Sequence, residues 1–372
     1  MNHPRRIAIN GKFLITQTGY KSGVYRVARE LVTAMDAVLA RGEPRYRDVE
    51  CTLLAPAVPV DLPLAAIRLH RSGRASTLLK GIPWEQLALP GLSADAVLLN
   101  LCNLGPLAKA DAFTMIHDAQ VYSSPGSYST AFRLWYRLML PALGRRNRGI
   151  LTVSGFSASE LARHGVVAPS RVHVVHNGCD HVLRIVPDRG FPQRAGLSAG
   201  PYVAALATTQ VHKNIGILFD AFRMPALAGT TLALFGNDTR EDFERAGHDV
   251  PGNVRFLGRV DDGELVGLLQ GATALAFPSL TEGFGLPPLE AMRVGCPAIV
   301  ARAGALPEVC GIDTLQADPH DAEQWALQVG RLRDDAGFAA DVRARGIEHA
   351  RAFTWERAAR RVLDVALGQT EA

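Results

Sequence analysis

The 372-residue sequence is poor in cysteine, and this shortage limits what the protein can be. Its five cysteines are odd in number and lack C-x-x-C spacing; they are Cys51, Cys102, Cys179, Cys296 and Cys310. The pattern argues against a disulfide framework and against a zinc site. It predicts that the cysteines pack as small hydrophobic side chains.

Long apolar runs are also missing. No run of 18 or more apolar residues occurs, and the N-terminal stretch M-N-H-P-R-R-I-A-I-N has no signal-like apolar core. We therefore expect a cytoplasmic protein that does not span a membrane. The length predicts two domains, and 48% apolar with 20% charged residues is an ordinary composition for globular domains.

Charge is divided unevenly along the chain. Residues 1–185 contain 22 Lys+Arg against 12 Asp+Glu, a net of +10, whereas residues 186–372 contain 18 against 24, a net of −6. The basic half is expected to meet an anionic partner such as a membrane surface or a phosphorylated acceptor. Nucleic acid is not expected, because the charges are scattered and no recognition motif occurs.

The most informative stretch is S-L-T-E-G-F-G-L-P-P-L-E, residues 279–290. An apolar run at 272–278 predicts a strand before it, and Pro287 and Pro288 suit the first turn of a helix after it. A strand, a glycine loop and a helix N-terminus together favour the binding of phosphate or another anion. Glycines at 283 and 285 let a ligand approach the backbone closely.

Two carboxylates, Glu282 and Glu290, bracket this loop. A fixed carboxylate can accept two hydrogen bonds from a vicinal diol, each worth about 1.5–3 kcal/mol, and sugars and ribose carry such diols. A lone Glu290 would be explained equally well by the helix dipole. The pair favours a binding site.

Strands and helices alternate along both halves, which predicts α/β domains with parallel sheets. The expected strands are 6–10, 49–54, 96–99, 113–116, 150–153 and 172–175, then 202–206, 231–235, 254–257, 272–277 and 297–300. A periodic helix follows Gly23, but the glycines before it do not fit G-x-G-x-x-G, so this is a weak phosphate signal. His117 follows strand 113–116 at its carboxyl end, where ligands bind in such sheets, although a structural histidine explains it equally well.

Two further segments carry charge of interest. Residues 127–148 combine aromatic side chains with five arginines, which fits a helix at a membrane interface or a core-facing helix with a solvated basic side. Lys213, in a loop between strand 202–206 and a helix expected from about 214 to 222, is the only lysine beyond residue 109. A compact ammonium is well suited to neutralise a diphosphate. The segment from residue 322 onward is expected to be helical throughout.

These motifs together resemble glycosyltransferase family 4. The resemblance is carried mainly by A-F-P-S-L-T-E-G-F-G-L-P-P-L-E-A-M-R-V-G-C-P-A-I-V, with K-N and F-L-G-R-V ahead of it, and it extends weakly over most of the chain. The family implies the α/β GT-B architecture, two Rossmann-like domains facing across a cleft. The expected divisions are an acceptor-side domain at 1–185, a linker at 186–200, a nucleotide-sugar-binding domain at 201–354, and a helix at 355–372 that crosses back to the first domain.

The resemblance also implies transfer of a hexose from a nucleotide-sugar with retention at the anomeric carbon. Glu290 would hold the donor ribose, Glu282 the donor sugar and Lys213 the diphosphate, while His117 would touch the sugar near the reacting carbon. His117, Glu282 and Lys213 form the implied catalytic set. The remaining implied donor-binding residues are Gly23, Thr208, Gly258, Val260, Gly283, Phe284, Gly285 and Leu286.

One position departs from the common family pattern. Thr208 stands where many relatives have an arginine, which is similar to a subset that includes many mannosyltransferases and removes one phosphate-neutralising charge. GDP-mannose is therefore the first expected donor, followed by UDP-sugars or a deoxyhexose donor. A saccharide acceptor, lipid-linked and belonging to a surface polysaccharide, agrees with the basic first half.

The sequence contains no D-x-D motif, so no metal and no cofactor are expected. The family's proposed same-face mechanism needs no carboxylate nucleophile, because the leaving phosphate oxygen takes the acceptor's proton. Two alternatives remain open at this stage. One is a nicotinamide-dependent oxidoreductase, which the βα units allow but the poor G-x-G-x-x-G fit disfavours, and the other is a non-catalytic sugar-nucleotide sensor.

Overall fold

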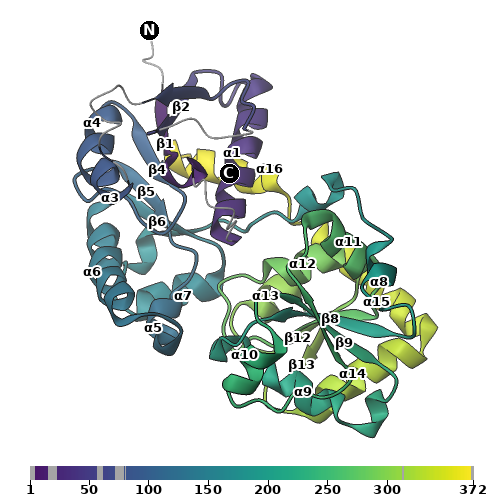
Figure 1. The fold of residues 1–372 in the computed structure, drawn as a ribbon. Helices are drawn as coiled ribbons and strands as arrows, with labels where there is room; N and C mark the ends of the chain where they lie inside the picture. The colour runs from purple at the N-terminus through teal and green to yellow at the C-terminus, as the bar shows by residue number, and fades with distance from the viewer. Residues whose placement is uncertain are drawn as a thin grey trace. The chain divides into compact units, whose positions relative to one another are not determined.

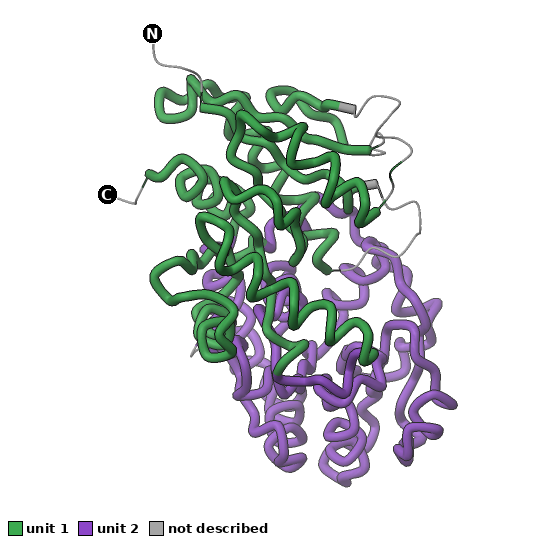
Figure 2. Tube along the Cα trace, turned by 90° about the vertical axis from the view of Figure 1, so that its left-hand side faces the viewer, with its two compact units in different colours: residues 1–122, 129–178, 354–372 green, residues 123–128, 179–353 purple. Residues whose placement is uncertain are grey.

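The computed structural model describes residues 5–15, 23–56, 62–71, 79, 81–311 and 314–369. The chain forms two compact units (Figure 2). Unit 1 contains Met1–Tyr122, Ser129–Gly178 and Thr354–Ala372, and unit 2 contains Ser123–Tyr128 and Cys179–Phe353. Each unit is built on one parallel sheet, as the alternating strand and helix pattern predicts.

The sheet of unit 1 has the strand order β3-β2-β1-β4-β5-β6-β7. Its strands are β1 (Arg5–Asn10), β2 (Val49–Ala55), β3 (Arg68–Arg71), β4 (Val97–Asn100), β5 (Ala112–Met115), β6 (Gly149–Thr152) and β7 (Val172–Val174). All pairs are parallel, for example Ile7 opposite Cys51 and Val97. The order reverses between β1 and β4, and in parallel sheets of this kind ligands bind at the carboxyl ends of the strands where the order reverses.

Helices cover both faces of this sheet (Figure 1). They are η1 (Lys12–Ile15), α1 (Gly23–Ala40), α3 (Gly81–Pro83), η2 (Trp84–Ala88), α4 (Leu89–Leu92), α5 (Gln120–Ser123), α6 (Thr130–Arg146), α7 (Gly155–Arg163), η4 (Pro169–Arg171) and α16 (Trp355–Ala366). The final helix, α16, packs along α1, so the predicted return of the C-terminal helix to the first domain is confirmed. Most of the side chains buried on these two helices are apolar. They include Leu31 and Val32 of α1 and Val362 and Leu363 of α16, which are all fully buried.

The sheet of unit 2 has the order β10-β9-β8-β11-β12-β13, again parallel. Its strands are β8 (Tyr202–Ala207), β9 (Thr231–Gly236), β10 (Val254–Gly258), β11 (Ala274–Phe277), β12 (Ala298–Ala301) and β13 (Leu315–Ala317). The reversal lies between β8 and β11. The loops that carry Lys213 and Glu282 leave from these two strands, so strand order alone brings them to one edge of the sheet.

The helices of unit 2 are η3 (Pro125–Ser127), η5 (Asp180–Arg184), α8 (Phe191–Arg194), η6 (Val211–Lys213), α9 (Gly216–Phe222), η7 (Pro225–Leu227), α10 (Arg240–Arg245), α11 (Asp262–Gly271), α12 (Leu286–Arg293), α13 (Leu306–Cys310), α14 (Ala322–Asp334) and α15 (Ala336–Ala350). The short segment Ser123–Tyr128 belongs to this unit, where Ser127 Oγ lies 2.8 Å from His212 Nδ1. All five cysteines carry free thiols.

Three predicted boundaries differ from the structure or are refined by it. The tail is not helical throughout, because Asp335 ends α14 and its side chain caps α15 by accepting from Phe338 N at 2.8 Å. The helix expected from residue 214 begins at Gly216, since Asn214 is left-handed with φ 56°. Residues 186–200, the expected linker, lie within Cys179–Phe353, the longer segment of unit 2.

Candidate functional site

The glycine loop of unit 2 joins β11 to α12, as the sequence predicts. Gly285 stands immediately before the helix with φ 100°, and a Cβ there would lie 2.6 Å from Leu306 Cδ2. Both the left-handed backbone and the close contact therefore require glycine. Pro287 and Pro288 fill the first turn and lack N–H groups, so backbone donors at this helix end come from the loop and from Leu286.

Lys213 and Glu282 lie in direct contact in this loop region. Lys213 Nζ is 2.5 Å from Glu282 Oε1, and the side chains are 18% and 11% exposed. The ammonium also lies 5.7 Å from the Phe277 ring centroid. The sequence predicts both residues as ligands of a donor but gives no sign that they pair with each other. An ammonium has three donors, so one bond to Glu282 leaves capacity for phosphate oxygens.

Asn214 fixes the position of Lys213, and sequence reasoning assigned it no role. Its backbone is left-handed, which asparagine tolerates better than most residues. Its Nδ2 donates to Pro319 O at 2.8 Å and to Pro278 O at 3.3 Å, which ties the Lys213 turn to the end of β11. The K-N pair in the sequence was the available signal.

Gly304 lets the turn after β12 pack closely against the backbone of Glu282. It has φ 60°, and a Cβ there would lie 2.6 Å from Glu282 N. Ala305 N donates to Glu282 O at 3.1 Å. The turn after β12 thus holds the Glu282 backbone, and a larger residue at 304 would displace it.

Glu290 lies on the second turn of α12 and is 9% exposed. Its Oε1 is 3.0 Å from Nε2 of His181, a buried residue on η5. His181 follows the H-N-G-C-D motif in the sequence, but no spacing rule connects position 181 with position 290. Sequence reasoning therefore missed this contact.

The other predicted donor residues of unit 2 have varied environments. Gly258 ends β10 with φ 71°, and Val260 follows it on the loop to α11. Phe284 is 5% exposed, and its ring packs edge-on against Phe353 with centroids 6.1 Å apart. The Phe284 side chain thus serves packing, while the backbone of residues 283–286 forms the loop.

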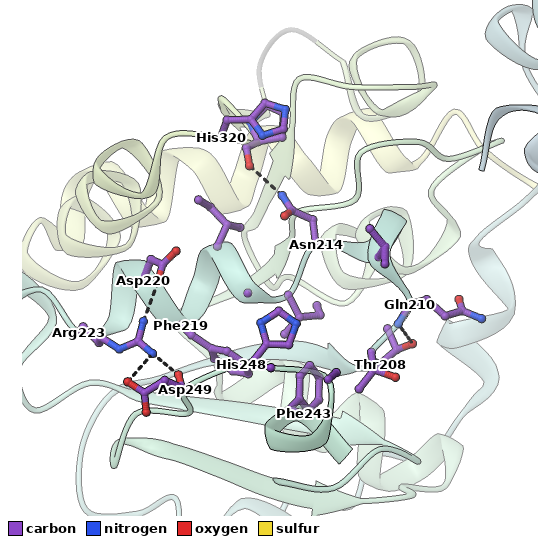
Figure 3. Close-up of a pocket in the computed structure, with 18 residues that line it drawn as sticks. Thr208, Gln210, Asn214, Phe219, Asp220, Arg223, Phe243, His248, Asp249 and His320 are labelled. Atoms are coloured by element: carbon purple, nitrogen blue, oxygen red, sulfur yellow. Dashed lines mark hydrogen bonds and ion pairs between the residues drawn. The ribbon is translucent and has the colours of Figure 1, made fainter. Parts of the chain in front are cut away.

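Thr208 lines a cavity of about 720 Å³ beside the Lys213 turn (Figure 3). Asn214, His248 and His320 contribute to its wall, and Arg223 bridges Asp220 and Asp249 at one side. Among the predicted donor-binding residues, all of which the structure describes, Thr208 lines this cavity and Lys213, Glu282 and Glu290 do not.

Two predicted site residues belong to unit 1, which is described by itself. Gly23 is the first residue of α1, and most of the loop before it lies outside the described residues. His117 follows β5 and is 6% exposed, with Nε2 2.9 Å from Leu101 O and its backbone N–H donating to Asn103 Oδ1. Burial lowers the pKa of His117 to about 4. The ring is therefore neutral near pH 7, with Nε2 as donor and Nδ1 as acceptor.

Helix α6 of unit 1 has a buried apolar side and an exposed side that carries both apolar and basic residues. Met139, Leu140 and Leu143 are buried against the unit, but Leu134 and Leu138 on the outer side are each 62% exposed. Trp135 is also exposed, as are the arginines Arg137, Arg145 and Arg146. The helix thus has a core-facing side and a second, solvent-facing apolar stripe.

Two features are absent from the part of the chain that the structure describes. No group of three or more His, Cys, Asp or Glu side chains among them is arranged to hold a metal ion. Within the same residues, no helix combines the length and apolar character needed to cross a bilayer.

Comparison with known proteins extends these observations. Residues 200–335 match the family model described as glycosyl transferases group 1, and this range includes Lys213, Glu282 and Glu290. The O-antigen chain mannosyltransferase B of Escherichia coli is 32% identical over 260 residues, which cover 66% of this chain and 67% of that protein. The MMP alpha-(1->4)-mannosyltransferase of Mycolicibacterium hassiacum is 29% identical over 286 residues, covering 72% and 67%.

Not every relative is matched over most of its length. The D-inositol 3-phosphate glycosyltransferase of Salinispora tropica is 35% identical over 226 residues, so the match covers 53% of this chain and 46% of that protein.

Solved structures share the fold over nearly the whole chain. The structure of HepE from Anabaena in complex with UDP and glucose has a TM-score of 0.69 at 17% identity, covering 98% of this chain and 100% of that chain. WaaG, a glycosyltransferase involved in lipopolysaccharide biosynthesis, has a TM-score of 0.65 at 18% identity, covering 97% and 100%. At these identities the likeness concerns the fold.

Proposed function

Because this chain belongs to the group 1 glycosyltransferases, has their GT-B fold and is a hexosyltransferase of polysaccharide synthesis, we propose that it transfers mannose from GDP-mannose with retention. The names of its relatives, which include O-antigen chain mannosyltransferases, support the choice of sugar. Thr208, in place of the arginine common in the family, supports the same choice.

The observation that carries the proposal is the Lys213–Glu282 contact beside the glycine loop and α12. Loss of the donor's diphosphate leaves negative charge, which an oriented ammonium and the loop N–H groups would stabilise. Glu282 holds Lys213 in place and, in this proposal, accepts hydrogen bonds from the sugar hydroxyls. Glu290 accepts hydrogen bonds from the ribose hydroxyls.

The proposed chemistry is a same-face displacement. The bond between the anomeric carbon and the departing phosphate oxygen breaks, and a bond to the acceptor oxygen forms on the same face. The acceptor's proton passes to the departing phosphate oxygen, so the step needs no protein nucleophile. His117 would contact the sugar as a neutral ring, because its low pKa keeps a positive charge away from the developing oxocarbenium carbon.

We further propose that the acceptor is a lipid-linked saccharide, reached at the cytoplasmic surface of an anionic membrane. The support is the exposed stripe of Leu134, Trp135 and Leu138 on α6, which ends in the basic pair Arg145 and Arg146. An amphipathic surface of this kind binds at a bilayer interface through apolar burial and attraction to anionic lipids.

The donor and the two key residues are tested by a transfer assay with purified protein. GDP-mannose is compared with UDP-sugars and a GDP-deoxyhexose, and sugar release without acceptor is measured as well. Glu290→Ala and Lys213→Ala should each reduce transfer from GDP-mannose at least about tenfold, or about 1.4 kcal/mol of transition-state stabilisation.

Two controls sharpen this test. Glu348→Gln removes an exposed carboxylate of α15 that pairs with Arg351 outside the site and should leave transfer unchanged. Lys213→Arg keeps the charge that pairs with Glu282 and should retain part of the activity. Turnover near wild type in the Glu290 or Lys213 alanine variants would contradict the site, and a β-linked product by NMR would contradict retention.

A further inference from the structure

His181 is a buried side chain that the chemistry above leaves without a role. Its side chain is 3% exposed and that of Glu290 is 12% exposed, and 3.0 Å separates Nε2 from Oε1. We propose that His181 is a positioning residue, which holds the Glu290 carboxylate in the orientation that accepts the ribose hydroxyls of the donor. This inference rests on the ribose-binding role of Glu290 in the proposed function.

The backbone that carries His181 is fixed by several bonds. Cys179 N donates to Phe353 O at 3.0 Å, and its thiol lies 3.4 Å from Ala350 O, so the start of the turn is attached to the end of α15. Val182 N donates to Cys179 O at 3.4 Å within the same turn. The imidazole therefore reaches Glu290 from an anchored turn, while Glu290 itself comes from α12.

Nε2 of His181 and Oε1 of Glu290 are at an ion-pair distance, but in this structure the ring nitrogen is not aligned for a regular hydrogen bond. An ionised carboxylate only accepts, so the proposed positioning requires a proton on Nε2 that is directed at Oε1 when the donor binds. In this proposal Oε1 is held by the protein and Oε2 accepts from the ligand. Glutamate has three rotatable side-chain bonds, and fixing them before the ligand binds reduces the ordering cost of binding.

A positioning role and a purely structural role make different predictions. If His181 only stabilises the fold, its replacement should lower stability and weaken every ligand of unit 2 to the same degree. If His181 positions Glu290, its replacement should weaken only the ligands that carry ribose hydroxyls. The preference for a ribose diol over a dideoxyribose is thus the informative quantity.

Two substitutions separate the two nitrogen positions of the ring. The amide nitrogen of His181→Gln takes roughly the place of Nε2, whereas that of His181→Asn takes the place of Nδ1. The full-length protein is titrated by calorimetry with GDP and with 2′,3′-dideoxy-GDP, and the UDP pair is run alongside. The wild type should prefer the diol by at least about tenfold in Kd.

We expect His181→Asn to lose this preference, with Kd for the dideoxy nucleotide almost unchanged, and His181→Gln to retain most of it. Thermal unfolding of each variant shows whether the fold is intact. Glu290→Gln provides the reference, because it should lose the diol preference by direct removal of the carboxylate charge.

The outcomes separate the inference from the proposed function. Loss in Glu290→Gln with a wild-type preference in both histidine variants would overturn the role of His181 alone. A preserved preference in Glu290→Gln, or no binding of either nucleoside diphosphate to the wild type, would overturn the proposed donor site and this inference with it. Equal weakening of diol and dideoxy ligands in His181→Asn would assign His181 a structural role.

Discussion

Lys213 and Glu282 meet because the loops that carry them follow β8 and β11, which are neighbours in one sheet. The residue types could be interpreted from the sequence. A single lysine, and two glutamates on either side of a glycine loop, suit a ligand that carries both phosphate and sugar. The pairing was not predictable, since Glu282 lies 69 residues from Lys213 and the strand order that brings them together is a property of the sheet. The positions of Asn214, Gly304 and His181 depend on the same long-range packing.

His117 gives a pH prediction at the scale of one side chain. Its pKa in the folded protein is about 4, against an ordinary value of about 6.5. The unfolded chain therefore binds this proton first as the pH falls, and stability declines between pH 6.5 and 4. At pH 4 the loss from this group approaches about 3 kcal/mol.

The matched variant is His117→Gln, whose amide can still donate to Leu101 O but does not titrate. Hydrogen exchange of the β5 and β6 amides should show the wild type losing more protection than the variant as the pH is lowered through this window. Parallel losses in the two proteins would show that His117 already binds its proton near the ordinary pKa.

His117→Ala should impair transfer more than nucleotide binding.

At the scale of elements, residue periodicity and the positions of Gly and Pro predicted the helix α1 and the strands of both sheets except β3 and β13. Errors occurred where a single side chain ends or starts a helix, as Asp335 does between α14 and α15 and Asn214 does before α9. Such breaks depend on local hydrogen bonds that compete with the helix pattern. The sequence of α6 did not show which of its apolar residues face the core. Apolar residues occur on the exposed side of this helix as well as on its buried side.

Helix α6 yields a prediction about vesicle binding. Protein should sediment with vesicles that contain phosphatidylglycerol and much less with pure phosphatidylcholine. Leu134→Gln with Leu138→Gln should weaken this binding at least about tenfold, because each leucine loses part of the roughly 1.5–3 kcal/mol gained on burial. Arg145→Gln should weaken it by about 1 kcal/mol and reduce its dependence on salt.

Leu327→Gln is the control for this experiment. Leu327 is a leucine of α14 in unit 2 that is 67% exposed, so it matches the α6 leucines in type and exposure. Binding that is unaffected by the α6 changes, or affected equally by Leu327→Gln, would contradict a membrane role for α6.

For the whole molecule, the prominent feature is the return of the chain to unit 1 through α16. Arg360 donates to Glu43 at 2.6 and 2.7 Å, and Arg41 donates to Glu356 at 2.7 and 2.8 Å. Hydrogen bonds from Arg41 and Arg360 lower the pKa of Glu356 to about 2. Beneath these partly exposed pairs, the buried face of α16 packs on α1.

We predict that Leu363→Ala lowers the free energy of unfolding of unit 1 by about 2–5 kcal/mol, because Leu363 is fully buried. Scanning calorimetry should show a lower transition for unit 1 and an unchanged one for unit 2. A chain ending at Phe353 should lose the unit 1 transition and keep that of unit 2. Unchanged unfolding of unit 1 in the shortened chain would contradict a stabilising role for α16.

Unit 1 is built from three separate segments of the chain, and this determines when each unit can finish folding during synthesis. Domains ordinarily fold in the order in which they leave the ribosome. Here the first unit to begin emerging is the last to be finished, because residues Thr354–Ala372 are added only after all of unit 2. Until α16 has been made, the apolar side of α1 lacks its partner, and the nascent chain must keep that surface from aggregating while unit 2 is made.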